Sequence, residues 1–218
     1  MQTAIVIGAT GLVGRHLVDL LLKNNQVSKV KSFVRRKSGV EHPKLEEHVV
    51  DFDTPKTWKE KLTGDVLFSA MGTTLKKAGT KEKQYKIDVT YQYKTAKHAA
   101  ENKVSKYVLV SSPGANEKSM FFYSQIKGEL DNKVKKLPFE HISIIKPSVL
   151  VGNRNEKRLG EELSIKIGGW ITKIPGLKKY RPIKGKTVAK AMIRAAENNS
   201  MSYQEYELGE LFDLAGKK

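Results

Sequence analysis

One tyrosine, one lysine and a pair of serines have the residue types of a proton-transfer site. Tyr123 and Lys127 are four residues apart in a helical stretch, so they share one face of that helix. A phenol is a poor base at neutral pH, but a lysine ammonium one turn away favours the phenolate, which can exchange a proton with a carbonyl or alcohol oxygen. Ser111 and Ser112 end an apolar run, and either hydroxyl could hold that oxygen. Taken alone this spacing is common, and the alternative is an exposed Tyr and Lys without a role.

A glycine-rich turn near the N-terminus predicts a site for a dinucleotide. Gly8, Gly11 and Gly14 are three residues apart, between the apolar run Thr3–Ile7 and the amphipathic run Leu12–Leu22. We expect Gly8 to allow a tight turn, Gly11 to let backbone N–H groups approach a pyrophosphate, and Gly14 to bring the helix close to the strand. The positive end of the helix dipole then faces the phosphates. A tight turn without a ligand is the alternative, but the strand–turn–helix context favours a dinucleotide.

The chain after the second apolar run indicates which dinucleotide binds. Val30–Val34 has the pattern of a strand, and Arg35, Arg36 and Lys37 follow it with no acidic residue before Gly39. In a Rossmann unit this strand end lies beside the adenosine ribose, where a carboxylate binds the 2′-hydroxyl and arginine accommodates a 2′-phosphate. The sequence therefore favours NADP(H) over NAD(H). The alternative is a basic loop that is exposed by chance.

Two further strand ends could contact the same cofactor. Asp51 lies near the end of the expected strand Glu47–Phe52 and could accept a hydrogen bond from the adenine amino group, although capping of a local turn explains it equally well. Met71 and Gly72 follow the expected strand Asp65–Ala70. A glycine at this position lets the backbone pass close to a cofactor at the carboxyl edge of a sheet.

Strand-like and helical patterns alternate along the chain. The expected strands are Thr3–Ile7, Val30–Val34, Glu47–Phe52, Asp65–Ala70, Lys106–Ser111 and His141–Ile145. The expected helices are Leu12–Leu22, a helix starting at Thr54-Pro55, Thr80–Asn102, Phe121–Leu130 and Thr187–Glu197. This alternation predicts an α/β fold with a Rossmann-type, doubly wound parallel sheet. We expect a single domain over residues 1–218, with a small C-terminal substrate-side lobe at 152–180.

Composition excludes several classes of protein. The 218-residue chain has no cysteine and its five histidines occur singly, so we expect neither a disulfide framework nor a metal site. No run is long enough to span a membrane, and the sequence has no apolar export leader, so we expect a cytoplasmic protein. The net charge is +17, but the lysines are scattered and no aromatic residues are interleaved with them. A solvated basic surface is therefore expected rather than a specific nucleic-acid site.

Taken together, these motifs resemble an atypical branch of the short-chain dehydrogenase/reductases, like the HIV Tat-interacting-protein-like and NmrA-like NAD(P)-binding oxidoreductases. The resemblance covers nearly the whole chain. It rests on Gly-Ala-Thr-Gly-Leu-Val-Gly-Arg from Gly8, Val34-Arg35-Arg36, Met71-Gly72-Thr73-Thr74, Lys77-Ala78-Gly79, Leu109-Val110-Ser111-Ser112-Pro113-Gly114-Ala115, Tyr123-x-x-x-Lys127-Gly128-Glu129 and Lys146-Pro147-Ser148-Val149-Leu150. It implies that NADPH contacts Thr10, Gly11, Leu12, Val13, Arg35, Arg36, Gly72, Thr73, Tyr123, Lys127, Leu150 and Arg158.

The resemblance also implies an activity. Members of this kind transfer a hydride between NADPH and a small carbonyl or alcohol substrate. By this resemblance Tyr123 would donate the proton, Lys127 would lower the pKa of the Tyr123 phenol, and Ser112 or Ser111 would hold the substrate oxygen. Many short-chain reductases complete the proton relay with an Asn in the fourth helix, where this chain has Asp88. The alternative is an NADPH-sensing regulatory or scaffold protein that binds a macromolecular partner without turnover. A monomer and a homodimer are both compatible with the sequence.

Overall fold

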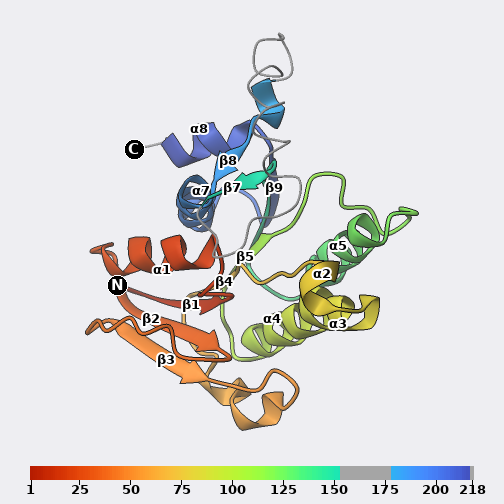
Figure 1. Cartoon of the computed structure of the whole chain (residues 1–218). Helices are drawn as coiled ribbons and strands as arrows, with labels where there is room; N and C mark the ends of the chain where they lie inside the picture. The colour runs from red at the N-terminus through yellow and green to blue at the C-terminus, as the bar shows by residue number, and fades with distance from the viewer. Residues whose placement is uncertain (153–177, 217–218) are drawn as a thin grey trace.

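A parallel sheet of seven strands runs through the middle of the molecule (Figure 1). The computed structural model describes residues 1–152 and 178–216. The strands are β1 (Gln2–Ile7), β2 (Val27–Val34), β3 (Leu45–Val49), β4 (Val66–Ser69), β5 (Lys106–Val110), β6 (His141–Lys146) and β9 (Tyr203–Glu207). They pair in the order β3-β2-β1-β4-β5-β6-β9, and every pairing is parallel. The predicted α/β fold with a Rossmann-type parallel sheet is therefore confirmed.

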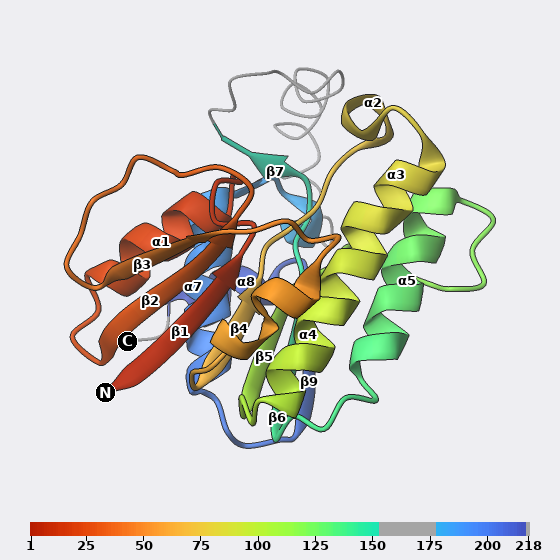
Figure 2. The same ribbon diagram turned by 90° about the horizontal axis from the view of Figure 1, so that it is seen from below.

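Helices cover both faces of the sheet (Figure 2). One face packs against α1 (Gly14–Leu22), α7 (Gly185–Glu197) and α8 (Glu210–Gly216), and the other against α4 (Gln92–Glu101) and α5 (Phe122–Val134). Alternate residues of β1 enter opposite cores, Ala4 and Val6 on the α1 side and Ile5 and Ile7 on the α4 side. This is the alternation that a strand buried on both faces requires.

The order of the strands reverses at β1. The chain moves from β1 to β2 and β3 on one side, then crosses back to β4 and β5 on the other. In open α/β sheets, ligands bind outside the carboxyl ends of the strands at such a switch point. The segments that follow β1 and β4 are therefore brought together at the place where a cofactor is expected.

Two predicted elements near residue 50 differ from the structure. The third strand ends at Val49 rather than Phe52, because the chain turns there and carries Phe52 into the core. The helix expected from Thr54 is replaced by two short 3-10 turns, Pro55–Thr57 and Lys59–Lys61, and Thr54 makes no side-chain cap. The turns fold around Trp58, which is 3% exposed and donates its indole N–H to the carbonyl oxygen of Asp51 at 2.8 Å.

The long helix predicted at Thr80–Asn102 is divided. It consists of α3 (Lys81–Tyr85), a π-helical segment at Lys86–Tyr91, and α4, and a short helix, α2 (Leu75–Ala78), precedes it. Wider turns of this type in helices are frequent at functional sites. Here the π-helical segment carries Asp88, which faces the site described below.

The C-terminal part contains elements that the sequence did not predict. Strand β9 (Tyr203–Glu207) extends the sheet beside β6, and a separate two-stranded sheet joins β7 (Leu150–Val151) to β8 (Ile183–Lys184). Most of the predicted lobe at 152–180, including Arg158, lies outside the described residues. Across residues 1–152 and 178–216, no helix has the length and apolar character needed to cross a bilayer.

Candidate active site

The glycine turn leaves no room for side chains between β1 and α1. Gly8 has a φ of +78°, and a Cβ there would lie 2.5 Å from the backbone carbon of Ala70 at the end of β4. A Cβ on Gly14 would lie 2.1 Å from the carbonyl oxygen of Gly8, so the first turn of α1 packs directly on the strand end. The Gly11 N–H donates to that same oxygen at 2.9 Å. The expected roles of Gly8 and Gly14 as turn and packing residues agree with this geometry.

Two adjoining cavities form one groove along the carboxyl edge of the sheet. The larger, about 1090 Å³, lies over the ends of β1, β2 and β4, and the smaller, about 370 Å³, reaches α5 and β7. They share lining residues Thr10, Gly11, Ala70, Met71, Gly72, Thr73, Thr74 and Lys77. Among the predicted site residues, those that line the groove are Gly8, Thr10, Gly11, Leu12, Val13, Arg35, Met71, Gly72, Thr73, Ser111, Tyr123, Lys127 and Leu150.

Among residues 1–152 and 178–216, three predicted cofactor residues lie outside the groove lining. Gly14 packs beneath the turn, Arg36 is exposed beside Arg35, and Asp51 accepts a hydrogen bond from the Asp53 N–H at 2.9 Å. The carboxylate of Asp51 thus caps a local turn, the alternative that the sequence left open. Its neighbour Phe52 lines the groove instead.

The distant end of the groove combines aromatic and cationic side chains. Phe33, Phe52 and Tyr91 line it together with Arg35, and Lys76 and Lys77 approach from α2. Sequence reasoning missed these aromatic residues and the two lysines. The signal for the lysines was present, because a charged pair follows the glycine segment that was predicted to border the cofactor.

The lysine of the Tyr-x-x-x-Lys pair is buried beside a carboxylate. Lys127 is 3% exposed, and its Nζ lies 3.4 Å from Oδ1 of Asp88 and 3.5 Å from the carbonyl oxygen of Val110. The other oxygen of Asp88 accepts the Thr73 N–H at 3.1 Å. Burial opposes the charge on Lys127, but Tyr123, Asp88 and Asp131 together outweigh it and raise the lysine pKa. Lys127 therefore stays an ammonium, one helical turn from the partly exposed Tyr123.

Of the two serines, Ser111 lines the groove. Its hydroxyl donates to Oδ2 of Asp131 at 2.9 Å, and its backbone N–H continues the sheet by donating to Ile145. The hydroxyl of Ser112 donates instead to the carbonyl oxygen of Pro113 at 3.3 Å. Adjacent residues of an extended chain point to opposite sides, so only one of the pair can face the groove. The sequence left open which of the two serines would hold the substrate oxygen, and of the two it is Ser111 that lines the groove.

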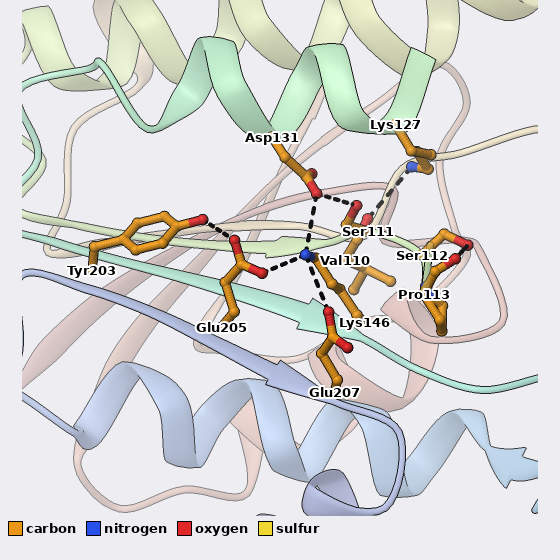
Figure 3. Close-up of polar contacts among 10 residues, drawn as sticks. All are labelled: Val110, Ser111, Ser112, Pro113, Lys127, Asp131, Lys146, Tyr203, Glu205 and Glu207. Carbon is orange, nitrogen blue, oxygen red and sulfur yellow. Dashed lines mark hydrogen bonds and ion pairs between the residues drawn. The ribbon is translucent and has the colours of Figure 1, made fainter. Parts of the chain in front are cut away.

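A charged network continues from Ser111 toward the edge of the sheet, buried at Asp131 and Lys146 and partly exposed at the two glutamates that follow (Figure 3). Lys146, at the end of β6, lies 4.0 Å from Asp131 and 3.2 Å from Glu207, and forms a short ion pair with Glu205. Glu205 also accepts a hydrogen bond from the Tyr203 hydroxyl. Burial opposes the charge on Lys146, but these carboxylates raise its pKa overall. Strand β9, which the sequence did not predict, supplies both glutamates.

Comparison with known proteins indicates a family that binds a nicotinamide dinucleotide. A sequence model of a protein family described as NAD(P)H-binding matches residues 8–160. The Candida albicans protein FMP52, mitochondrial, is 36% identical over 204 residues, which cover 90% of this chain and 88% of that protein. Its Debaryomyces hansenii counterpart is 37% identical over 201 residues, covering 89% of this chain and 88% of that protein.

Solved structures share the fold. The Bordetella bronchiseptica enzyme WbmH in complex with NAD+ superimposes with a TM-score of 0.72 at 13% identity, covering 96% of this chain and 76% of that one. UDP-glucose 4-epimerase from Thermotoga maritima gives a TM-score of 0.69 at 14% identity, covering 98% and 81%. At these identities the likeness concerns the fold alone.

The comparisons correct the expected location. The sequence predicts a cytoplasmic protein. The similar proteins from Candida albicans and Debaryomyces hansenii are both named as mitochondrial, so that prediction is wrong. It rested on the lack of an apolar export leader. Mitochondrial address segments are amphipathic and Arg-rich rather than apolar, so the absence of an export leader has no bearing on them.

Proposed function

The chain belongs to the NAD(P)H-binding family, and from this premise we propose that it is an NADPH-dependent reductase of small carbonyl compounds, of the atypical short-chain dehydrogenase/reductase type. A nicotinamide cofactor and an oxidoreductase type of protein follow from the family. The preference for NADPH, the carbonyl substrate and the proton relay are the added claims. The observation that carries the proton relay is the buried Lys127–Asp88 pair, which lies beside Tyr123 in the same groove as the glycine turn, and Arg35 in that groove supports the preference for NADPH.

The groove fits an extended dinucleotide. A Cβ on Gly8 or Gly14 would meet backbone atoms, so the turn and the first turn of α1 pack tightly on the strand end, and Gly11, which lines both cavities, is where we expect a pyrophosphate to approach the backbone. The N-terminus of α1 adds a favourable dipole, and its first turn holds no acidic residue that would repel phosphate. The aromatic end of the groove suits an adenine, and the opposite end, at Tyr123 and Leu150, suits the nicotinamide.

The charges at the adenosine end favour NADPH. Arg35 lines the groove at the end of β2, where the ribose is expected. Glu47, on the neighbouring strand β3, accepts hydrogen bonds from the Ser32 hydroxyl at 3.2 Å and from the Ser38 N–H at 3.0 Å, and it does not line the groove. A 2′-phosphate would therefore meet a guanidinium rather than a carboxylate.

Fluorescence titration with NADPH and NADH tests this choice. Charge-assisted hydrogen bonds contribute about 1.5–3 kcal/mol, so Arg35→Ala should weaken NADPH binding about tenfold or more and leave NADH binding nearly unchanged. Lys37→Ala, two residues further along the same basic loop, is the matched control and should have little effect. Equal affinity for the two dinucleotides in the wild-type protein would refute the preference.

The residues at the other end can complete a carbonyl reduction. When bound, the reduced nicotinamide supplies a hydride to the carbonyl carbon. Tyr123 donates its phenolic proton to the carbonyl oxygen as that oxygen gains charge, so an alcohol forms. The Lys127 ammonium stabilises the phenolate left on Tyr123 until a proton from solvent replaces the one transferred, and Asp88 holds that ammonium in place. Ser111 fixes the position of the substrate oxygen.

Catalysis is tested with a panel of aldehydes and ketones, following the oxidation of NADPH. The wild-type protein should turn over at least one carbonyl compound, and Tyr123→Phe should lower kcat by about 10²–10⁴-fold while NADPH affinity is kept. Tyr93→Phe, on α4 outside the groove lining, is the control and should retain activity. NADPH binding with no turnover across the panel would refute the reductase and favour the sensor.

The names of the relatives also suggest where the protein works. We place it in mitochondria, as the FMP52 proteins are named. Cell fractionation with antibodies against the native chain should recover it with mitochondrial markers, and recovery in the cytosolic fraction alone would refute this location.

A further inference from the structure

The Asp131 carboxyl lies on the same face of α5 as the two proposed catalytic side chains. It follows Lys127 by four residues and Tyr123 by eight, so the three occupy successive turns of the helix. Asp131 is 6% exposed. Its Oδ2 accepts the Ser111 hydroxyl, and its Oδ1 has no hydrogen-bond partner in the described part of the chain. In the described part of the chain, the hydrogen bond from Ser111 therefore links Asp131 to the groove, and the charge of Asp131 also acts on Lys127.

The nearby lysines compensate the negative charge of the Asp131 carboxylate only in part. Lys146 is nearest, at 4.0 Å, but this lysine is closer to Glu205 and Glu207. Burial raises the pKa of Asp131 to about 6, although the Ser111 hydrogen bond and the two lysines oppose that rise. The charged and titratable groups that act on Asp131, or on which it acts, are Lys127 on α5, Lys146 on β6, Tyr107 on β5, and Tyr203 and Glu205 on β9. Asp131 can thus change its protonation state while Lys127 and Lys146 keep theirs.

The state of Asp131 decides what Ser111 can offer. A serine hydroxyl has one proton and two lone pairs. While Asp131 is ionised, that proton is held by the carboxylate, and Ser111 presents only lone pairs to the groove. A carbonyl oxygen needs a donor, so this state does not help to bind it. A protonated Asp131 can instead donate to the Ser111 oxygen, which frees the serine proton for the carbonyl.

We propose that Asp131 is a positioning residue that acts through Ser111: the ionised carboxylate turns the serine hydroxyl away from the groove, and protonation of the carboxyl releases it to hold the substrate carbonyl. This inference rests on the proposed reductase function for the identity of the bound group. The coupling between Asp131 and Ser111 is a property of the protein itself. No proton is consumed at Asp131, since the proton transferred to substrate comes from Tyr123.

The coupling is measured first without cofactor or substrate. In protein labelled with ¹³C at aspartate carboxyls, the signal lost in Asp131→Asn identifies Asp131, and its shift is followed from about pH 4 to about pH 8. We expect a midpoint near 6, moved upward in Ser111→Ala because the hydrogen bond that favours the ionised form is gone. A midpoint in the ordinary aspartate range, or one that Ser111→Ala leaves unchanged, would overturn the inference.

The consequence for the substrate is measured with a carbonyl compound that the protein reduces. In the wild-type protein its KM should rise several-fold between about pH 5 and about pH 7.5, while kcat and NADPH affinity follow their own profiles. Asp131→Asn and Ser111→Ala should both remove this rise, and Asp131→Glu, which keeps a carboxyl, should restore it. A purely structural Asp131 predicts the same KM profile in wild type and Asp131→Asn, which would also overturn the inference.

The proposed reductase function and the role of Asp131 can be refuted separately. If NMR detects the coupling but no carbonyl compound is reduced at any pH, the proposed function fails and the Asp131–Ser111 coupling stands. If reduction occurs and the KM rise persists in Asp131→Asn, the reductase stands and the role of Asp131 fails.

Discussion

Replacing the buried Lys127 by methionine should destabilise the fold far more than the same replacement of an exposed lysine, even one whose ion pair is shorter. Lys127 and Asp88 are 3.4 Å apart, and their side chains are 4% and 1% exposed. Removing one partner of a buried pair leaves the other charge in a poorly solvating environment, which costs about 3–5 kcal/mol. Methionine is unbranched and of similar length, so the added cost of a cavity is small. Because the Thr73 N–H still donates to Asp88, we expect the lower end, about 3 kcal/mol.

The matched control is Lys23→Met. Lys23 and Asp19 are only 2.7 Å apart, but their side chains are 73% and 50% exposed. Exposed pairs of this kind contribute about 0.2–1 kcal/mol because water screens them. The shorter ion pair should therefore have the smaller effect on stability.

Urea unfolding followed by circular dichroism measures both variants. With a slope of about 2 kcal/mol per molar urea, Lys127→Met should lower the midpoint by about 1.5 M, and Lys23→Met by less than about 0.5 M. Adding Asp88→Asn to Lys127→Met removes the remaining charge and should recover part of the loss. Equal, small shifts in the two single variants would refute the argument that burial determines the effect of the pair.

The same variant has a predicted pH dependence. Without the Lys127 ammonium, burial raises the folded-state pKa of Asp88 above its unfolded value. A raised acid pKa contributes stability at low pH that is lost as pH rises through the folded pKa. The deficit of Lys127→Met relative to wild type should therefore shrink as pH is lowered from about 7 toward about 5. A deficit that is independent of pH would contradict this account.

Three further predictions test other parts of the structure. Gly14→Ala places a Cβ against the Gly8 carbonyl and should cost at least about 1–3 kcal/mol in urea unfolding, whereas Gly216→Ala, with open space around its Cβ, should be neutral or slightly stabilising; equal effects would refute the close packing. Lys76→Ala should weaken NADPH binding several-fold at low salt and less at high salt, and an effect independent of salt would contradict an electrostatic role. Wild-type stability should fall by about 2 kcal/mol more than that of Asp131→Asn between about pH 4 and about pH 6, because the folded-state pKa of Asp131 is raised to about 6; parallel pH profiles would contradict the shift.

The features visible in the sequence are those that depend on local spacing. Alternation of apolar runs predicted the parallel sheet, and the four-residue spacing of Tyr123 and Lys127 placed both on one face of α5. Extending that spacing by one more turn reaches Asp131, so the signal for the third residue was present. The spacing could not predict that the Asp131 carboxylate is buried, because the residues around it come from strands β5, β6 and β9 or directly follow them.

Other features depended on contacts between distant segments. Strand β9 has the sequence Tyr-Gln-Glu-Tyr-Glu, whose polar residues give no apolar pattern, and it pairs in parallel with β6, where Glu205 and Glu207 form ion pairs with Lys146. The choice between Ser111 and Ser112 depended on which one faces the groove. The 3-10 turns before β4 replaced a helix because Trp58 is drawn into the core.

Transfer of deuterium from NADPH to the product tests the central claim most directly. The protein is incubated with an aldehyde or ketone and NADPH carrying deuterium on one face of nicotinamide C4, and the alcohol is analysed by mass spectrometry and NMR. We predict that deuterium from one face alone appears on the carbinol carbon, and that Tyr123→Phe greatly slows its appearance without weakening NADPH binding. If NADPH binds and no carbonyl compound in the panel acquires deuterium, the groove does not carry out the reduction that we propose.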